Sequence, residues 1–372
     1  MIKEKKLRTE GPIEQYMALA IQPAMVGTFK KEDIKRNIDH ITDIIRAGYW
    51  LGGIEMPVKL AAIPEGALQG FNDELMDRDH VDFARNMAIE IPGTETDMLG
   101  KIAKEFDLYV IAQAKVKHPK ISDRFFNSAF LINPEGEVIL QSYKMQVFCR
   151  EHSMVPHDVW DKWIELYGYE MDSIYSVADT NIGRIGLIFC QEGDYPEPSR
   201  GLAMNGAEII YRSSAPEPAV SRGWWEIQNR ARALDNTCYV VAPNVASYLV
   251  HPQGTGPVDN FGGQSMVVHY DGRVLSSVTG GASIYAGGII DIESLREYRE
   301  RSLFGNWMKD LRTEQYKLIY EKPVFEKNLC MHRPPLKHAQ TDDLYRESIK
   351  RLIDRDIWAK SYKTKMKEKG NK

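Results

Sequence analysis

Cys190 stands at the end of an apolar segment whose pattern predicts an exposed nucleophile. Residues 185–189 are apolar and indicate a buried strand, and Gly193 and Pro196 indicate a turn into a helix that begins near Pro198. A thiol on such a turn faces a cleft beside a helix N-terminus, which favours the thiolate over the thiol. A free cysteine is more commonly a core residue, but the position of Cys190 after a strand and before a helix favours a catalytic role.

Two charged residues stand at the ends of other predicted strands. Glu65 follows the apolar segment 58–63, and Lys144 closes the predicted hairpin 128–141. A cysteine that attacks a carbon bonded to nitrogen needs a base for its proton and a donor for the developing oxyanion. Because the carboxyl ends of strands line the crevice at one sheet edge, we expect Glu65, Lys144 and Cys190 to meet there.

The composition is that of a folded globular protein. The chain has 372 residues, of which 43% are hydrophobic and 27% are charged, and its formal net charge is −4. This charge gives no reason to expect nucleic acid or a membrane surface as a partner. No apolar run approaches the roughly 20 residues that span a bilayer. Residues 1–8 are charged and precede no export signal, so we expect a cytoplasmic protein.

The cysteines and histidines do not predict a metal site. The four cysteines, at positions 149, 190, 238 and 330, are scattered, and no histidine lies near them at metal-ligand spacing. We therefore expect neither a metal nor an organic cofactor. None of the nine histidines stands in a catalytic motif, and His152 is expected to be structural or solvent-facing.

Strand and helix patterns alternate in two similar halves, followed by a charged extension. Helices are predicted at 32–47, 95–106, 198–205 and 224–234, and strands at 16–22, 58–63, 109–116, 128–132, 137–141, 185–189, 208–211, 239–242, 264–269, 273–276 and 286–291. This order is typical of mixed sheets with helices on their outer faces. We expect one domain at 1–292. Residues 293–372 would pack on it or on a neighbouring subunit.

The order Glu, Lys, Cys, each after a strand, resembles the nitrilase superfamily of carbon–nitrogen hydrolases. The segment AIPE at 62–65 is similar to its glutamate motif, SYK at 142–144 to its lysine motif, and GLIFCQEGDYPE at 186–197 to its nucleophile elbow. The resemblance covers about residues 16–291. It implies an α/β fold, a four-layer α-β-β-α sandwich of two mixed sheets, and a homo-oligomer, either a dimer or a larger assembly.

The resemblance also implies the role of each catalytic residue. Glu65 would be the general base and acid, Lys144 the stabiliser of the oxyanion, and Cys190 the nucleophile. Glu151 is the candidate for the family's second glutamate, although the residues between it and Lys144 depart from the usual proline-bearing sequence, and a surface charge is the alternative. The backbone N–H of Gln191 would be the second oxyanion donor.

The elbow looks most like that of aliphatic amidases and formamidases. Typical nitrilases have a tryptophan directly after the cysteine, where this chain has Gln191. The resemblance therefore implies that a small amide is hydrolysed to a carboxylic acid and ammonia through a cysteine thioester. Hydrolysis of an N-carbamoyl (ureido) compound is the first alternative, and nitrile hydrolysis is the second.

Two further expectations concern the residues that line the substrate pocket and the possibility that the protein is not an enzyme. We expect Arg212 and Ser213, which follow the predicted strand 208–211, to contact the substrate. We expect the same of Trp224, or alternatively Trp225, at the start of the next predicted helix. The fold could also serve as a catalytically silent binding scaffold. The presence of all three motif residues argues against a silent scaffold.

Overall fold

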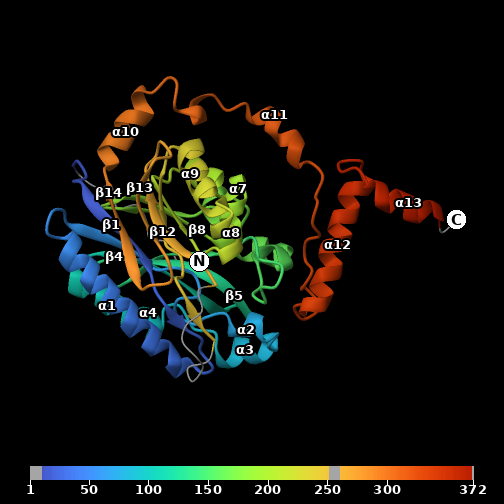
Figure 1. Cartoon of the computed structure of the whole chain (residues 1–372), viewed down its shortest axis with the longest axis horizontal. Coiled ribbons are helices and arrows are strands. Elements are labelled where there is room, and N and C mark those ends of the chain that lie inside the picture. The colour runs from blue at the N-terminus through green and yellow to red at the C-terminus, as the bar shows by residue number, and fades with distance from the viewer. Residues whose placement is uncertain (1–10, 251–259, 371–372) are drawn as a thin grey trace.

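The computed structural model describes residues 11–250 and 260–370, and it contains two six-stranded sheets packed face to face (Figure 1). The first sheet has the order β14-β1-β3-β4-β5-β6 and the second β13-β12-β10-β9-β8-β7. The first comprises β1 (Tyr16–Gln22), β3 (Val58–Ala62), β4 (Tyr109–His118), β5 (Ile121–Ile132), β6 (Val138–Tyr143) and β14 (Ile284–Ile290). The second comprises β7 (Val177–Thr180), β8 (Gly183–Phe189), β9 (Ile209–Ser213), β10 (Tyr239–Ala242), β12 (Gly263–Val268) and β13 (Val274–Thr279).

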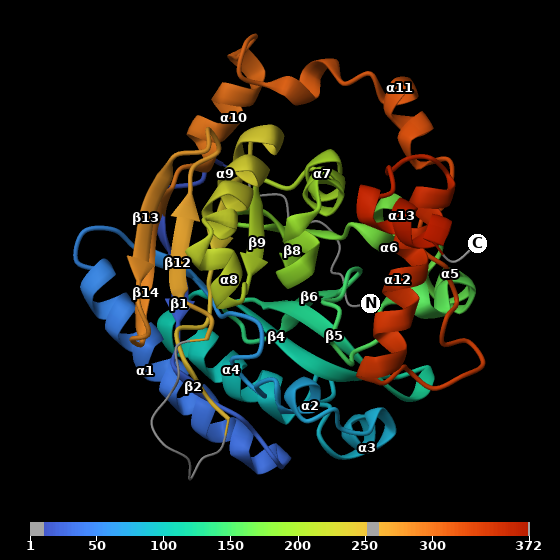
Figure 2. The ribbon, with the colours of Figure 1, turned by 45° about the vertical axis from the view of Figure 1, so that its right-hand side comes forward.

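Helices cover the outer face of each sheet (Figure 2). Helices α1 (Ile34–Gly52) and α4 (Thr94–Phe106) pack on the first sheet, and α7 (Pro196–Met204) and α9 (Trp224–Asn236) pack on the second. Apolar residues at helical spacing in α1, such as Ile38 and Ile45, are buried against the first sheet. The predicted four-layer α-β-β-α sandwich is confirmed.

The space between the sheets is filled by buried hydrophobic side chains. Ala18, Ala20 and Ala62 face inward from the first sheet, and Ile185 and Leu187 face them from the second. Small residues on one sheet opposite larger ones on the other allow the layers to interdigitate at interior packing density. This core fixes the relative position of the sheets, and with it the residues that follow their strands.

The strand directions bring three strand ends to one edge. Strands β1, β3 and β4 are mutually parallel, as are β8, β9 and β10, while the flanking strands run antiparallel. Two successive antiparallel pairings, β4 with β5 and β5 with β6, leave β6 running in the direction of β3. The Tyr211 hydroxyl donates a hydrogen bond of 2.6 Å to the Ile63 carbonyl and so joins the two sheets at this edge.

Helix α10 (Ile292–Arg301) starts the C-terminal extension and is part of the domain's packing. The predicted boundary at 292/293 falls at the start of this helix, and Leu295 is buried in the core between the sheets. The chain then follows the outside of the molecule through α11 (Thr313–Lys317) and returns to the domain, where Leu329 and Cys330 are buried (Figure 1). It continues into α12 (His338–Asp354).

The remaining elements are short and lie mainly in connections. They are β2 (Met25–Val26), β11 (Tyr248–Leu249), α2 (Asn72–Leu75), α3 (His80–Asn86), α5 (Trp160–Tyr167), α6 (Met171–Ile174), α8 (Glu217–Ser221) and α13 (Tyr362–Gly370). No helix among the described residues is long and apolar enough to cross a membrane. Residues 1–8, on which the expectation about an export signal rests, lie outside the described residues.

Truncation of a side chain between the sheets should destabilise the whole sandwich. Ile185 is 0% exposed, so Ile185→Ala is expected to lower the free energy of unfolding by about 2–5 kcal/mol, measured by urea denaturation. The control is Ile227→Ala, at a residue 64% exposed, for which we expect a change within about 0.5 kcal/mol. Equal effects of the two substitutions would contradict this assignment of the core.

Candidate active site

A fully buried lysine joins two buried glutamates at the edge where the strands end. Lys144 Nζ lies 2.7 Å from Glu65 Oε1 and 2.5 Å from Glu151 Oε2. The side chains of Lys144, Glu65 and Glu151 are 0%, 3% and 2% exposed. An ammonium withdrawn from water is tolerated only when carboxylates compensate its lost hydration. The structure thus brings together three residues that are distant in sequence.

Neighbouring polar groups hold the two glutamates in place. The Asn127 amide donates hydrogen bonds to Glu65 Oε1 at 2.7 Å and to Glu151 Oε1 at 3.0 Å. Ser153 also donates to Glu151 Oε1 in a short contact. The Glu65 backbone N–H donates to the Ser213 hydroxyl at 3.3 Å, which ties β3 to β9. Such partners fix the carboxylates, because a satisfied buried network has few alternative geometries.

Cys190 follows β8 in a conformation that a non-glycine residue rarely adopts. Its φ is +52°, and the 3-10 helix η3 (Cys190–Asp194) starts at the cysteine itself. The buried Glu192 carboxylate accepts the backbone N–H of Phe189 at 2.9 Å and that of Met145 at 2.9 Å. These two bonds connect the elbow to the residue after Lys144. Strained backbone held by such contacts is a feature of functional sites.

Lys144 is protonated, and its partner Glu151 is ionised. Burial alone lowers the pKa of Lys144, but the nearby Cys190, Glu151 and Glu65 raise it well above its ordinary value. Burial raises the pKa of Glu151, yet the Lys144 charge and the hydrogen bonds from Lys144, Ser153 and Asn127 lower it overall. A permanent ammonium beside an ionised carboxylate is therefore the resting state of this pair.

The Cys190 thiol is held protonated, which differs from the thiolate that its position in the sequence suggests. Burial raises the pKa of Cys190 well above its usual value, and the negative charge of Glu65 raises it further. Lys144 acts in the opposite direction but does not outweigh them. The thiol consequently needs a base at the moment of attack, and Glu65 is the carboxylate next to it.

The three residues expected to contact the substrate lie in different environments. Ser213 is fully buried and touches the backbone of Glu65. Arg212 is also buried. Its guanidinium lies 4.2 Å from the centre of the Trp225 ring and pairs with Asp194 at 2.9 Å. Trp224 is 48% exposed, and its ring contacts a surface arginine.

Gln191 lies within η3 directly after Cys190, as an oxyanion donor requires. The role of its backbone N–H remains a prediction, as do the substrate contacts of Arg212, Ser213 and Trp224.

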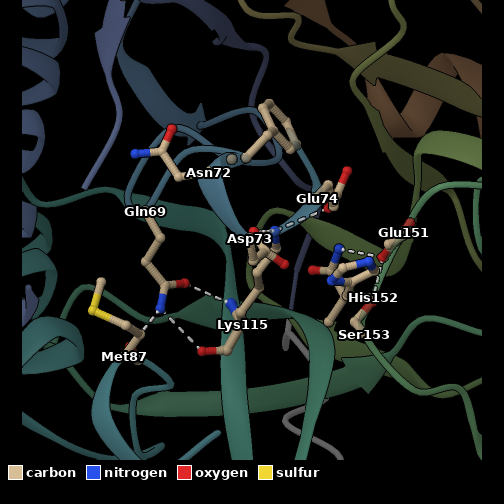
Figure 3. Close-up of polar contacts among 12 residues, drawn as sticks. Gln69, Asn72, Asp73, Glu74, Met87, Lys115, Glu151, His152 and Ser153 are labelled. Atoms are coloured by element: carbon tan, nitrogen blue, oxygen red, sulfur yellow. Dashed lines mark hydrogen bonds and ion pairs between the residues drawn. The ribbon is translucent and has the colours of Figure 1, made fainter. Parts of the chain in front are cut away.

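A second buried ion cluster lies next to Glu151 and escaped the sequence analysis (Figure 3). Lys115 Nζ makes a short contact with Asp73 and lies 2.9 Å from Glu74 Oε1. Burial raises the pKa of Glu74 to about 8, and the charge of Glu151 contributes to this shift. The available signal was Lys115 itself, a lysine inside the apolar strand β4, because a charged residue in such a strand needs a buried partner.

Glu65, Lys144, Glu151 and Cys190 include the types of group that attack on a carbonyl carbon needs. Glu65 can take the proton of Cys190, and the Lys144 ammonium can stabilise negative charge on the substrate oxygen. Glu151 compensates the ammonium when Glu65 becomes neutral. The protein groups present can therefore perform proton transfer, nucleophilic attack and oxyanion stabilisation.

Comparison with known proteins identifies the class that this fold and site define. The carbon-nitrogen hydrolase family model matches residues 18–300, which is most of the chain. The chain belongs to the carbon–nitrogen hydrolase family, and it is an enzyme of the nitrilase superfamily. The resemblance deduced from the three motifs is thereby confirmed.

Individual relatives are formamidases, amidases and other members of the superfamily. The chain is 28% identical to a formamidase of Bacillus cereus over 262 residues, which are 69% of this chain and 70% of the relative. A carbon–nitrogen hydrolase of Helicobacter pylori superposes with a TM-score of 0.64 at 20% identity, covering 83% of this chain and 99% of that one. An amidase mutant of Nesterenkonia sp. superposes with a TM-score of 0.58 at 17% identity, covering 84% and 99%. In that structure, the acetamide moiety of fluoroacetamide is covalently added to the active-site cysteine.

Glu192 should make the stability of the protein depend on pH. Burial raises its pKa from 4.5 to about 8, so the folded protein retains a proton that the unfolded chain has lost in this range. The free energy of unfolding should therefore fall as the pH rises from about 4.5 to 8, by on the order of a few kcal/mol. Urea denaturation at pH 5, 6.5 and 8 measures this slope.

Glu192→Gln removes one of two glutamates whose pKa is raised to about 8, the other being Glu74, so it should reduce the slope without abolishing it. The substitution also lowers stability because glutamine offers one acceptor oxygen to the two backbone N–H groups. Glu55→Gln, at an exposed glutamate, is the control and should keep the slope. An unchanged slope in Glu192→Gln would show that another group is responsible.

Proposed function

We propose that this enzyme hydrolyses a small uncharged amide to a carboxylic acid and ammonia, with Cys190 as its nucleophile. The observation that carries the proposal is the Lys144 ammonium held between Glu65 and Glu151 beside the elbow of Cys190. Formamidases among the relatives and an amidase among the solved structures support an amide as the substrate.

The first half of the reaction forms a thioester. Cys190 Sγ attacks the amide carbon while its proton passes to Glu65, and the charge on the carbonyl oxygen is stabilised by Lys144 Nζ and the Gln191 N–H. Glu65 then returns the proton to the nitrogen, the carbon–nitrogen bond breaks, and ammonia leaves. The protonated resting thiol makes this transfer to Glu65 necessary rather than optional.

The second half releases the acid. Water attacks the thioester carbon, Glu65 takes a proton from this water, and the thiolate of Cys190 leaves and is reprotonated. Glu151 stays ionised throughout and keeps Lys144 oriented, because its contacts with Asn127 and Ser153 do not involve the reacting atoms. These roles assign a separate task to each of the four residues.

A simple amide is favoured over the ureido alternative by the position of Arg212. A carboxylate on an N-carbamoyl amino acid needs an accessible cation, whereas Arg212 is 1% exposed and already pairs with Asp194. We propose that Arg212 instead packs against the elbow at Gly193. A Cβ on Gly193 would lie 1.9 Å from Arg212 Nε, so these two residues are in close contact.

We further propose a homo-oligomeric, cytoplasmic enzyme. Leu303 and Phe304 of the extension are 82% and 91% exposed, which is unusual for large apolar residues and suits a subunit contact. Four free thiols suit a reducing compartment. Light scattering after gel filtration measures the assembly.

Substitution of Cys190 should abolish hydrolysis without loss of the fold. Cys190→Ala is expected to lower ammonia release from formamide or acetamide by at least about 10³-fold, because no thioester can form. Ammonia is measured in a panel of amides, N-carbamoyl compounds and nitriles. The matched control is Cys149→Ala, at an exposed thiol, which should retain activity. Turnover by a folded Cys190→Ala variant would exclude the proposed nucleophile, and turnover of nitriles alone would exclude the proposed substrate class.

Removal of the buried ammonium should reduce the rate strongly. Lys144→Ala is expected to lower kcat/KM by about 10²-fold or more, because the oxyanion loses a charged donor. Circular dichroism and gel filtration check that the variant is folded, since two buried carboxylates then lack their cation. Lys35→Ala, at an exposed lysine, is the control. A folded Lys144→Ala variant with only a few-fold loss would contradict the role of Lys144.

A further inference from the structure

Three potential metal ligands converge beside the active site, from segments that no spacing in the sequence connects. Asp77 follows α2, His152 follows Glu151, and His338 is the first residue of α12 in the C-terminal extension. One ligand atom from each lies within 4.8 Å of the others. Asp77 Oδ1 is 2.9 Å from His152 Nε2 and 4.0 Å from His338 Nε2.

Two of these atoms are buried without a hydrogen-bond partner. Asp77 Oδ1 and His152 Nε2 form a close ion-pair contact of 2.9 Å, but neither makes a well-aligned hydrogen bond with the other or with any other described residue. His152 is only 5% exposed, so solvent does not readily replace the missing partner. Buried polar atoms in proteins nearly always make hydrogen bonds, so two neighbouring buried atoms that make none require an explanation.

We propose that Asp77, His152 and His338 bind a divalent transition-metal ion of the Zn²⁺ type. Two imidazole nitrogens and one carboxylate oxygen are a donor set that this class of ion prefers. Metal–ligand bonds of about 2.0–2.1 Å in a tetrahedron place the ligand atoms about 3.3 Å apart. The separations of Asp77 Oδ1 from the two histidine nitrogens, 2.9 and 4.0 Å, bracket this value.

The surroundings allow an ion to enter and complete its coordination. The Asp77 side chain is 42% exposed and that of His338 is 25% exposed, so water can fill the fourth position from this side. His338 Nε2 lies 3.1 Å from the Arg150 carbonyl oxygen, and this hydrogen bond is exchanged for the bond to the metal. The site is independent of the proposed chemistry, which uses Cys190.

The ion would fasten the extension to the segment that carries Glu151. His152 and Ser153 follow Glu151 directly and lie beside it (Figure 3). On the other side, Arg150 pairs with Asp342 of α12 at 2.9 Å. A bond from the ion to His338 would add to this ion pair and hold α12 against the same segment. The proposed role is therefore structural, and binding of the ion should stabilise the folded chain.

The test measures metal binding in the full chain with the Cys190→Ala substitution, so that the catalytic thiol cannot act as a ligand. After treatment with a chelator, the protein is titrated with Zn²⁺ by calorimetry, and bound metal is determined by elemental analysis. We expect one Zn²⁺ per chain, a higher Tm with Zn²⁺ than with Mg²⁺, and visible d–d absorption with Co²⁺ without a thiolate charge-transfer band.

A pair of substitutions in the extension locates the site. His338→Gln should weaken Zn²⁺ binding by about 100-fold or more, because loss of a ligand costs at least as much as loss of the groups that orient it. His332→Gln, at an exposed histidine of the same extension, should leave binding unchanged. Absence of Zn²⁺ binding, equal binding by His338→Gln, or a thiolate band with Co²⁺ would overturn the proposal. Because ammonia release is not measured, failure here is distinguishable from failure of the proposed hydrolysis.

Discussion

The enclosed ammonium of Lys144 is the constraint on which the active site depends. A lysine with no solvent contact is stable only beside compensating carboxylates, and here two glutamates from separate segments supply them. Each glutamate must in turn be held at hydrogen-bonding distance, which is the task of Asn127 and of the Ser213 contact to the backbone. The sandwich provides this accuracy because its rigid core fixes where β3, β6 and β8 end.

The same enclosure determines the state of the nucleophile. The thiol of the half-buried Cys190, beside Glu65, resists ionisation, although Lys144 is close. In the proposed reaction, the Lys144 ammonium stabilises the negative charge that develops on the sulfur or on the substrate oxygen. It does not ionise the thiol of the resting enzyme. The elbow conformation of Cys190, with a φ of +52°, is maintained by the two backbone hydrogen bonds to Glu192.

Much of the fold could be predicted from local patterns, and the proposed catalytic residues from strand ends. Strand β1 has the predicted bounds because it is a continuous apolar run up to Gln22, and α4 differs by one residue because its apolar residues recur at helical spacing. The start of the charged extension forms only the short helices α10 and α11, since little of it is buried. Strand β7 was missed because it is only four residues long and lies at a sheet edge.

What sequence patterns could not supply are relations between distant segments. The convergence of His152 with His338 depends on how the extension returns to the domain, and the partners of Lys115 come from α2. The protonated state of Cys190 depends on burial, which a motif does not specify. His152 was expected to be structural or solvent-facing, and the structure shows it buried, with its Nε2 2.9 Å from Asp77 Oδ1 but without a well-aligned hydrogen bond.

The excess of carboxylates over ammonium around Lys144 has a consequence for turnover. A neutral amide enters this environment without electrostatic repulsion, but the acid released from the thioester ionises and then faces like charges at short range. The site thus discriminates between what it consumes and what it makes through charge alone. Product accumulation should therefore inhibit such an enzyme only weakly near neutral pH.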